Sequence, residues 1–177
     1  KFDVIIPGMV IKPKRNLTVN FSHPYAYLTV GMAANKKMAA KDGLKTKEDW
    51  NSRSVTLTIK RGTAPGETAR RNFPKARVRQ FDDDAQALQD VLNGNAHAFL
   101  TSEPKPTHYV LDNPDVLYHP FGRGPFDPSA SAFAVRKGDP DALNFFNNWI
   151  LYHELNGWLK ETHDKWFKGR DWKSRLK

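Results

Sequence analysis

Short runs of alternating apolar and polar residues recur along the chain, and their β-branched and aromatic content predicts strands. The predicted strands cover residues 3–9, 18–22, 28–34, 54–59, 76–81, 96–101, 116–121 and 131–136. The first two flank the sequence GMVIKPKRNLTVN. We therefore predict a short β-hairpin that presents Arg15.

Helical spacing of apolar residues separates several of these strands. One predicted helix covers residues 64–72. The sequence FDDDAQALQDVLNGN predicts a second helix, for which the acidic residues 82–84 provide the N-terminal cap. A third helix is predicted after Glu103, where Pro104 and Pro106 impose a late start.

The end of the chain predicts two helices within residues 139–167, separated at Asn156 and Gly157. The predicted buried face of the first helix consists of Leu143, Phe146, Ile150 and Leu151. Four aromatic side chains are predicted to dock the two helices on a sheet: Trp149, Trp158, Trp166 and Phe167. These aromatic residues therefore indicate packing rather than a ligand site.

The order of the elements predicts an α/β fold. Strands alternate with helices from residue 54 to residue 101, which is typical of a parallel sheet with right-handed crossovers. The strands at 18–34 and 131–136 lie outside this alternation. We therefore expect the chain to leave one lobe near residues 28–31 and to return to it near residues 129–132.

Composition and charge narrow the classes of function. The 177 residues include no cysteine, which excludes disulfides, thiolate metal sites and a cysteine nucleophile. Mean hydropathy is -0.67, and no apolar run reaches the length that a membrane-spanning helix needs. The net charge of +9 permits an anionic partner. Because the basic residues are spread along the chain without interleaved aromatic residues, nucleic acid is disfavoured.

Two features indicate recognition of an anion. Gly62 and Thr63 form a turn between a predicted strand and a predicted helix, so backbone N–H groups and the positive helix end face the same point. Thr63 adds a hydroxyl group. Arg15 is the second feature, because a guanidinium on a rigid hairpin can hold a carboxylate through two parallel hydrogen bonds. Taken singly, such a turn is often only conformational and such an arginine only a surface charge.

Patterns for catalysis and metal binding are missing from the sequence. The six histidines form no helix-face pair with metal-ligand spacing. No Gly-x-Ser-x-Gly motif occurs, and Ser102 beside Glu103 has no placed histidine. We therefore predict no catalytic residue, no metal site and no cofactor.

These segments together resemble the type 3 periplasmic solute-binding proteins of polar amino-acid ABC transporters. The matching segments are KFDVIIPGMVIKPKR with VNFSHPY, the Gly-Thr turn, ALQDVLNGNAHAFLTSEP, and FAVRKGDPDAL with GWLKETHDKWF. The resemblance implies the two-lobed type II fold of periplasmic-binding proteins, with two hinge crossovers and closure around a ligand. The expected lobes are residues 1–29 with 130–177, an N-terminally incomplete first lobe, and residues 30–129.

The resemblance also implies contacts with the carboxylate of a ligand. Arg15 and Thr63 match family positions that bind this group, and Gly62 shapes the loop that carries Thr63. Val10 stands where the family usually has threonine or serine. The hydroxyl contact is therefore lost, whereas the backbone N–H of Val10 remains available.

The expected contact with the α-ammonium of a ligand departs from the family pattern. Ser102 stands where the family usually has the aspartate that pairs with this ammonium. Glu103, or a residue outside this sequence, would then have to supply the negative charge. Tyr25 and Tyr27 are further candidates, either for the cleft or for packing.

The resemblance implies a monomeric periplasmic or extracellular protein, with a signal peptide in its precursor rather than in this chain. It would capture a small carboxylate-bearing solute, an amino acid or a derivative, and deliver it to an ABC permease. One alternative is a cyclohexadienyl dehydratase for prephenate or arogenate on the same scaffold, although Lys105 stands where those enzymes carry an acidic residue. Another alternative is a ligand-sensing domain of a receptor.

Overall fold

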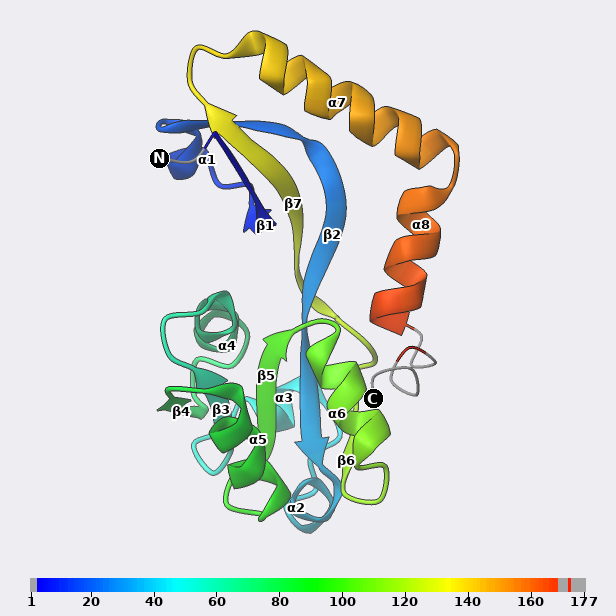
Figure 1. Cartoon of the computed structure of the whole chain (residues 1–177). Coiled ribbons are helices and arrows are strands. Elements are labelled where there is room, and N and C mark those ends of the chain that lie inside the picture. Colours follow the sequence, from blue (N-terminus) through cyan, green and yellow to red (C-terminus); the bar gives the residue numbers. More distant parts are fainter. Residues whose placement is uncertain (1–2, 169–171, 173–177) are drawn as a thin grey trace. The chain divides into compact units, whose positions relative to one another are not determined.

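The computed structural model describes residues 3–168 and 172, and it confirms a mixed α/β fold (Figure 1). Contacts divide the chain into two compact units. The first unit contains Lys1–Leu28 and Pro128–Lys177, and the second contains Thr29–Asp127. Two strands carry the chain from one unit to the other, namely β2 (Val19–Asn35) and β7 (Phe126–Arg136).

The sheet of the second unit has the strand order β2-β5-β3-β4. Its remaining strands are β3 (Thr56–Lys60), β4 (Arg77–Phe81), β5 (Ala98–Ser102) and β6 (Leu117–Tyr118), which pairs with β2. β3 is parallel to both β4 and β5, with Leu57 opposite Ala98. β2 is antiparallel to β5. The predicted parallel α/β arrangement is therefore confirmed, with an antiparallel strand beside it.

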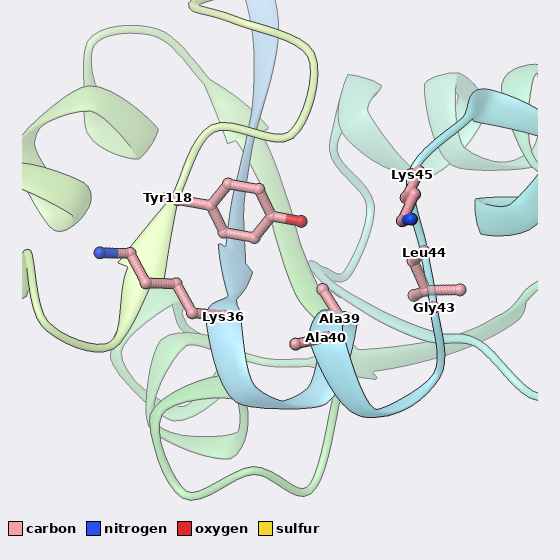
Figure 2. A pocket seen from close by; sticks show the side chains of 7 residues that line it. All are labelled: Lys36, Ala39, Ala40, Gly43, Leu44, Lys45 and Tyr118. Atoms are coloured by element: carbon pink, nitrogen blue, oxygen red, sulfur yellow. The ribbon is translucent and has the colours of Figure 1, made fainter.

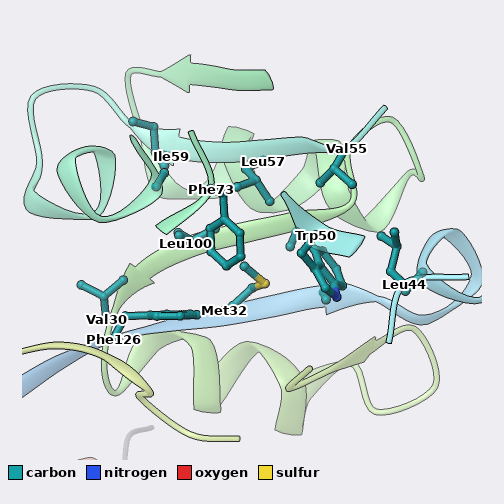
Figure 3. Packing of buried hydrophobic residues seen from close by; sticks show 14 residues of the cluster. Val30, Met32, Leu44, Trp50, Val55, Leu57, Ile59, Phe73, Leu100 and Phe126 are labelled. Atoms are coloured by element: carbon teal, nitrogen blue, oxygen red, sulfur yellow. The ribbon is translucent and has the colours of Figure 1, made fainter. Parts of the chain in front are cut away.

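Helices cover both faces of this sheet. One face carries α2 (Lys36–Lys41), α3 (Lys47–Trp50) and α4 (Ala64–Asn72), and the other carries α5 (Asp84–Leu92) and α6 (Lys105–Asp112). The core beneath α4 includes Trp50, Leu57, Ile59, Phe73 and Leu100 (Figure 3). The opposite core includes Ala87, Val91 and Phe99. Neighbouring residues of β5 enter different cores because successive side chains of a strand point to opposite faces.

Three local predictions are corrected. A short helix, α1 (Pro13–Asn16), replaces the predicted hairpin loop, so Arg15 lies in a helical turn. Its start fits the preference of proline for the first helical position. The predicted strands at 18–22 and 28–34 are one strand, β2. The sequence pattern missed α2 and α3 because they are short and bury one residue each, Ala39 and Trp50.

In the first unit, helices pack on strands through aromatic rings. β1 (Val4–Val10) pairs antiparallel with β7, and the chain ends with α7 (Pro140–Leu155), α8 (Trp158–His163) and a π-helical segment (Asp164–Lys168). Phe133 of β7 stacks on Tyr25 of β2 at 4.7 Å between ring centroids. It also contacts Phe146 and Trp149 of α7. The His23 N–H of β2 donates to Asn147 Oδ1 of α7 at 2.7 Å, so α7 is attached to both strands.

The predicted packing of the C-terminal helices is confirmed in part. Ile150 is buried, but Leu151 is 52% exposed because one further residue rotates its side chain by about 100° around the helix. Trp149 contacts the strands, as predicted. The other three aromatic residues pack within the C-terminal segment instead: Trp158 on Trp149, Trp166 on Trp172 and Phe167 on His163.

His97 is a structural residue of the second unit. Its Nδ1 accepts a hydrogen bond from the Thr56 N–H at 3.0 Å, so the proton of the neutral ring lies on Nε2. Nε2 donates to Asp42 Oδ2 at 2.8 Å. The ring is buried and connects the start of β3 to the turn after α2.

We predict that His97→Ala lowers the free energy of unfolding by about 2 kcal/mol, because it leaves the buried Thr56 N–H without its acceptor. Urea denaturation checks this, with His23→Ala as the control because the His23 side chain is exposed. Equal losses in the two variants would contradict the assigned role.

Candidate functional site

The carboxyl ends of β3 and β5 form one edge of the sheet in the second unit, because these neighbouring strands are parallel. β3 leads into Gly62 and Thr63, and β5 ends at Ser102 and is followed by Glu103. We call this edge, with these four residues, the carboxyl edge. The structure thus brings together the predicted site residues of the second unit. Ligands of open α/β sheets bind beyond such strand ends.

The Gly62–Thr63 turn presents backbone groups more readily than its hydroxyl group. Gly62 has a φ of 71°, which favours glycine, and open space surrounds the position that a Cβ would occupy. The Thr63 hydroxyl donates to the Lys60 carbonyl at 2.6 Å and therefore does not cap α4. The first N–H groups of a helix carry its partial positive charge. In α4, Pro65 has no N–H and the Gly66 N–H donates to the Thr63 carbonyl at 3.1 Å. Thr63 and Ala64 therefore contribute the first N–H groups. An anion at this turn would meet these groups first, and the Thr63 hydroxyl would have to rotate to donate to it.

Glu103 carries a polar atom without a partner. Its Oε1 is buried and has no hydrogen-bond partner among the residues that the structure describes. Two glycines, which the sequence analysis missed, make room for this side chain. A Cβ on Gly31 would lie 2.4 Å from Glu103 Oε1, and a Cβ on Gly124 would lie 3.2 Å from its Cγ. A buried carboxylate oxygen is costly without a donor, so Glu103 is suited to an external cation.

A charged cluster attaches α4 to the start of β7. The Asp127 carboxylate accepts a hydrogen bond from the Thr68 hydroxyl and forms an ion pair with Arg71, both on α4. Burial raises the pKa of Asp127, but the hydrogen bonds from Thr68 and Arg71 and the charge of Arg71 outweigh it and hold the pKa below its usual value. Asp127 also has a φ of 48°, which is uncommon for a residue other than glycine. The helix that begins at the Thr63 turn is therefore fixed to the strand that leaves the second unit.

The predicted residues of the first unit also lie together. Arg15 Nη1 donates to the Val10 carbonyl at 2.8 Å, and the Arg15 side chain is exposed. Val10 lies opposite Ser131 of β7. The buried Oγ of Ser131 has no hydrogen-bond partner within the described residues, and no sequence motif pointed to it.

The two tyrosines considered in the sequence analysis differ in their surroundings. The Tyr25 hydroxyl donates to the Ile6 carbonyl at 2.8 Å, and its ring stacks on Phe133. Tyr25 is therefore a packing residue. Tyr27 is 72% exposed.

Other candidate chemistry has a structural explanation. Asp83 accepts a hydrogen bond from the Gln86 N–H at 2.8 Å, which confirms the acidic run as the start of α5. Within residues 3–168 and 172, no three histidine, aspartate or glutamate side chains gather as a metal ion would require. None of the described helices is both long and apolar enough to cross a membrane.

The sequence profile of the bacterial extracellular solute-binding proteins, family 3, matches residues 1–169. The chain belongs to this family. The resemblance noted from the sequence is therefore confirmed over nearly the whole chain.

Two curated members of the family show how far the match extends. The L-cystine-binding protein TcyJ of Escherichia coli (strain K12) is 29% identical over 167 residues, which cover 94% of this chain and 60% of TcyJ. The cyclohexadienyl dehydratase of Pseudomonas aeruginosa is 24% identical over 171 residues, which cover 96% of this chain and 62% of that enzyme. The chain thus spans about three fifths of each relative.

Solved structures give the same fold. A putative binding component of an ABC transporter from Wolinella succinogenes, complexed with lysine, is 31% identical with a TM-score of 0.85, and the match covers 98% of this chain and 73% of that one. The ancestral cationic amino acid solute-binding protein AncCDT-1 is 34% identical with a TM-score of 0.78, and the match covers 94% and 69%. The mixed α/β fold of this chain is therefore that of part of a solute-binding protein.

We predict that Asp127→Asn lowers the free energy of unfolding by about 1 kcal/mol at neutral pH, because the ion pair with Arg71 is lost. The ionised carboxylate stabilises the fold above the ordinary pKa of 3.8, and this contribution disappears as pH falls through the lower pKa of the folded state. Urea denaturation at about pH 6 and about pH 3 measures the free energy of unfolding of the variant and of the unmodified protein. The difference between the two free energies should be smaller at the acidic pH. A difference that stays constant with pH would contradict this role of the charge.

Proposed function

We propose that this chain is part of a two-lobed, extracytoplasmic solute-binding protein that captures an amino acid or a derivative and delivers it to an ABC permease. Membership of the family supports this function. The observation that carries it is the carboxyl edge, where the anion-directed Gly62–Thr63 turn and Glu103 follow neighbouring strands. The buried Oε1 of Glu103 has no partner among the described residues. The turn favours an anion and Glu103 favours a cation, so this edge suits a zwitterion.

The family resemblance assigns the carboxylate of the solute to Arg15, Val10 and the Gly62–Thr63 turn. Arg15 supplies a guanidinium that retains exposed N–H donors beside its bond to the Val10 carbonyl. The carboxylate is also assigned to the backbone N–H of Val10 and to the N–H groups at the start of α4. Gly62 gives the turn its shape. Thr63 would contribute its hydroxyl after giving up the Lys60 carbonyl.

The ammonium of the solute is assigned to Glu103. Ser102 is neutral and cannot provide the charge of the aspartate that the family usually has at this position. Glu103 follows it directly and holds a buried oxygen that lacks a donor in the described chain. An ammonium would supply that donor and the opposite charge.

Lysine and arginine are the first solutes to test. The Wolinella succinogenes protein was solved with lysine, and AncCDT-1 is named as a cationic amino acid solute-binding protein. TcyJ is named for L-cystine, so cystine belongs in the same screen.

Arg15→Ala is expected to weaken binding of the best amino acid about tenfold or more, because a charge-assisted contact with the carboxylate is lost. Calorimetric titration measures this, after a thermal-shift screen has identified the solute. Lys14→Ala is the matched control, since Lys14 is an exposed cation on the same turn. Equal affinities for the Arg15 variant and the unmodified protein would remove Arg15 from the site, and a screen without any stabilising amino acid would overturn the function.

Glu103→Gln tests recognition of the ammonium separately. The variant should lose about tenfold in affinity for lysine but bind 6-aminohexanoate, which lacks the α-amino group, as the unmodified protein does. Glu48→Gln on α3 is the control because Glu48 is exposed. If both ligands weaken equally, Glu103 does not bind the α-ammonium.

A dehydratase is the second candidate, because the Pseudomonas aeruginosa relative is a cyclohexadienyl dehydratase. Lys105, which stands where those enzymes carry an acidic residue, forms an ion pair with Asp84. A lysine at this position does not replace the carboxylate of those enzymes. Incubation with prephenate or arogenate distinguishes the functions, since formation of phenylpyruvate or phenylalanine would establish the enzyme and displace the transport function.

A further inference from the structure

A cavity of about 390 Å³ lies at the other end of the sheet in the second unit (Figure 2). It is lined by Lys36, Ala39, Ala40, Gly43, Leu44, Lys45 and Tyr118. α2 begins where β2 pairs with the first residue of β5, since Ala34 lies opposite Ala98. The cavity is therefore at the amino ends of the parallel strands, away from the carboxyl edge. None of the residues assigned to the solute lines it.

The floor and one wall of this cavity are apolar. Ala39 and Leu44 are buried in the core beneath α4, and the Tyr118 ring packs against the same core. The volume falls within the range of about 300 to 1,000 Å³ that is typical of small-molecule sites. A ring-sized apolar group would therefore find van der Waals contacts here.

Two hydrogen-bond donors, the Tyr118 hydroxyl and the Lys45 ammonium, lie on opposite walls (Figure 2). Neither forms a hydrogen bond or a short ion pair within the described residues. The charge of Lys45 also acts on Asp49, whose pKa is lowered by hydrogen bonds from Thr46 and Lys45 and, to a smaller extent, by this charge. Figure 2 shows the hydroxyl directed toward the side of the cavity formed by Leu44 and Lys45. Burial raises the pKa of Tyr118, which keeps the hydroxyl protonated as a donor. The hydroxyl is therefore available to donate a hydrogen bond to a ligand in the cavity.

The charges around the cavity favour an anion. No acidic residue lines it, and the two nearest acidic groups in sequence have protein partners: Asp42 binds His97, and Asp49 accepts from the Lys45 and Thr46 N–H groups. The Lys36 ammonium donates to the Pro114 carbonyl, so Lys36 contributes mainly its alkyl chain. Lys45 is then the cation that faces a ligand.

The walls are held in place by backbone contacts. The Leu44 N–H donates to the Ala39 carbonyl at 2.9 Å, and the Lys45 N–H donates to Asp49 Oδ2 at 3.0 Å. His97 fixes Asp42 just before this turn. A site whose walls are already ordered loses less entropy when a ligand binds.

We infer that this cavity binds a small carboxylate with a ring-sized apolar body, as a second site that is independent of the solute site. The ring lies on Ala39 and Leu44 beside Tyr118. The carboxylate accepts hydrogen bonds from the Lys45 ammonium and the Tyr118 hydroxyl.

Indole-3-acetate is a suitable probe, and indole-3-acetamide provides the same ring without the charge. Two-dimensional amide NMR titration should show saturable shifts at Gly43, Leu44 and Lys45 with the acid. Lys45→Gln should weaken this binding about tenfold, and Tyr118→Phe should weaken it several-fold. Lys41→Gln, which changes an exposed cation at the end of α2, should leave this binding unchanged, and so should Arg15→Ala.

Four outcomes would overturn the second site. The first is the absence of shifts in this segment, and the second is equal binding of acid and amide. The third is that Lys45→Gln binds the acid as tightly as the unmodified protein does, while its amide spectrum shows that it is folded. The fourth is loss of binding in Arg15→Ala, which would place the probe in the solute site instead.

Discussion

The parallel pairing of β3 with β5 is the constraint on which the second unit depends. Because the two strands run in the same direction, the turn at Gly62 and Thr63 and the end of β5 at Ser102 reach one edge. The antiparallel pairing of β2 with β5 sends α2 and its turn to the opposite edge. One sheet thereby separates a polar edge that suits a zwitterion from an apolar cavity that suits an aromatic carboxylate.

The position of the anion-directed turn depends on both ends of α4. At its first turn the helix provides backbone N–H groups, and near its last turn Thr68 and Arg71 bind Asp127 at the start of β7. A helix is stiff over this length, so the contact with Asp127 constrains the turn at the other end. This arrangement connects the proposed solute site with one of the two strands that join the units.

Local predictions succeeded where neighbours in sequence provide the partners. Asp83 caps α5 as predicted because its acceptor and the Gln86 N–H are three residues apart. Arg15 lies in a helical turn rather than on a hairpin because Pro13 is also a good first residue of a helix, which the strand-like flanks obscured. The stretch between the predicted strands at 18–22 and 28–34 continues as β2, although Pro24 lies within it.

The amino-acid sequence was sufficient for the α/β class and the Gly62–Thr63 turn, since these depend on periodicity, spacing and local backbone preference. It was sufficient for the family through the resemblance of its segments. Which polar atoms lack partners could be learned only from the folded chain. Glu103 Oε1 lies under Gly31 and Gly124, and the Tyr118 hydroxyl faces a turn far away in sequence. Whether a polar atom finds a hydrogen-bond partner depends on groups that folding brings together from distant positions. A short stretch of sequence therefore does not reveal which atoms lack a partner.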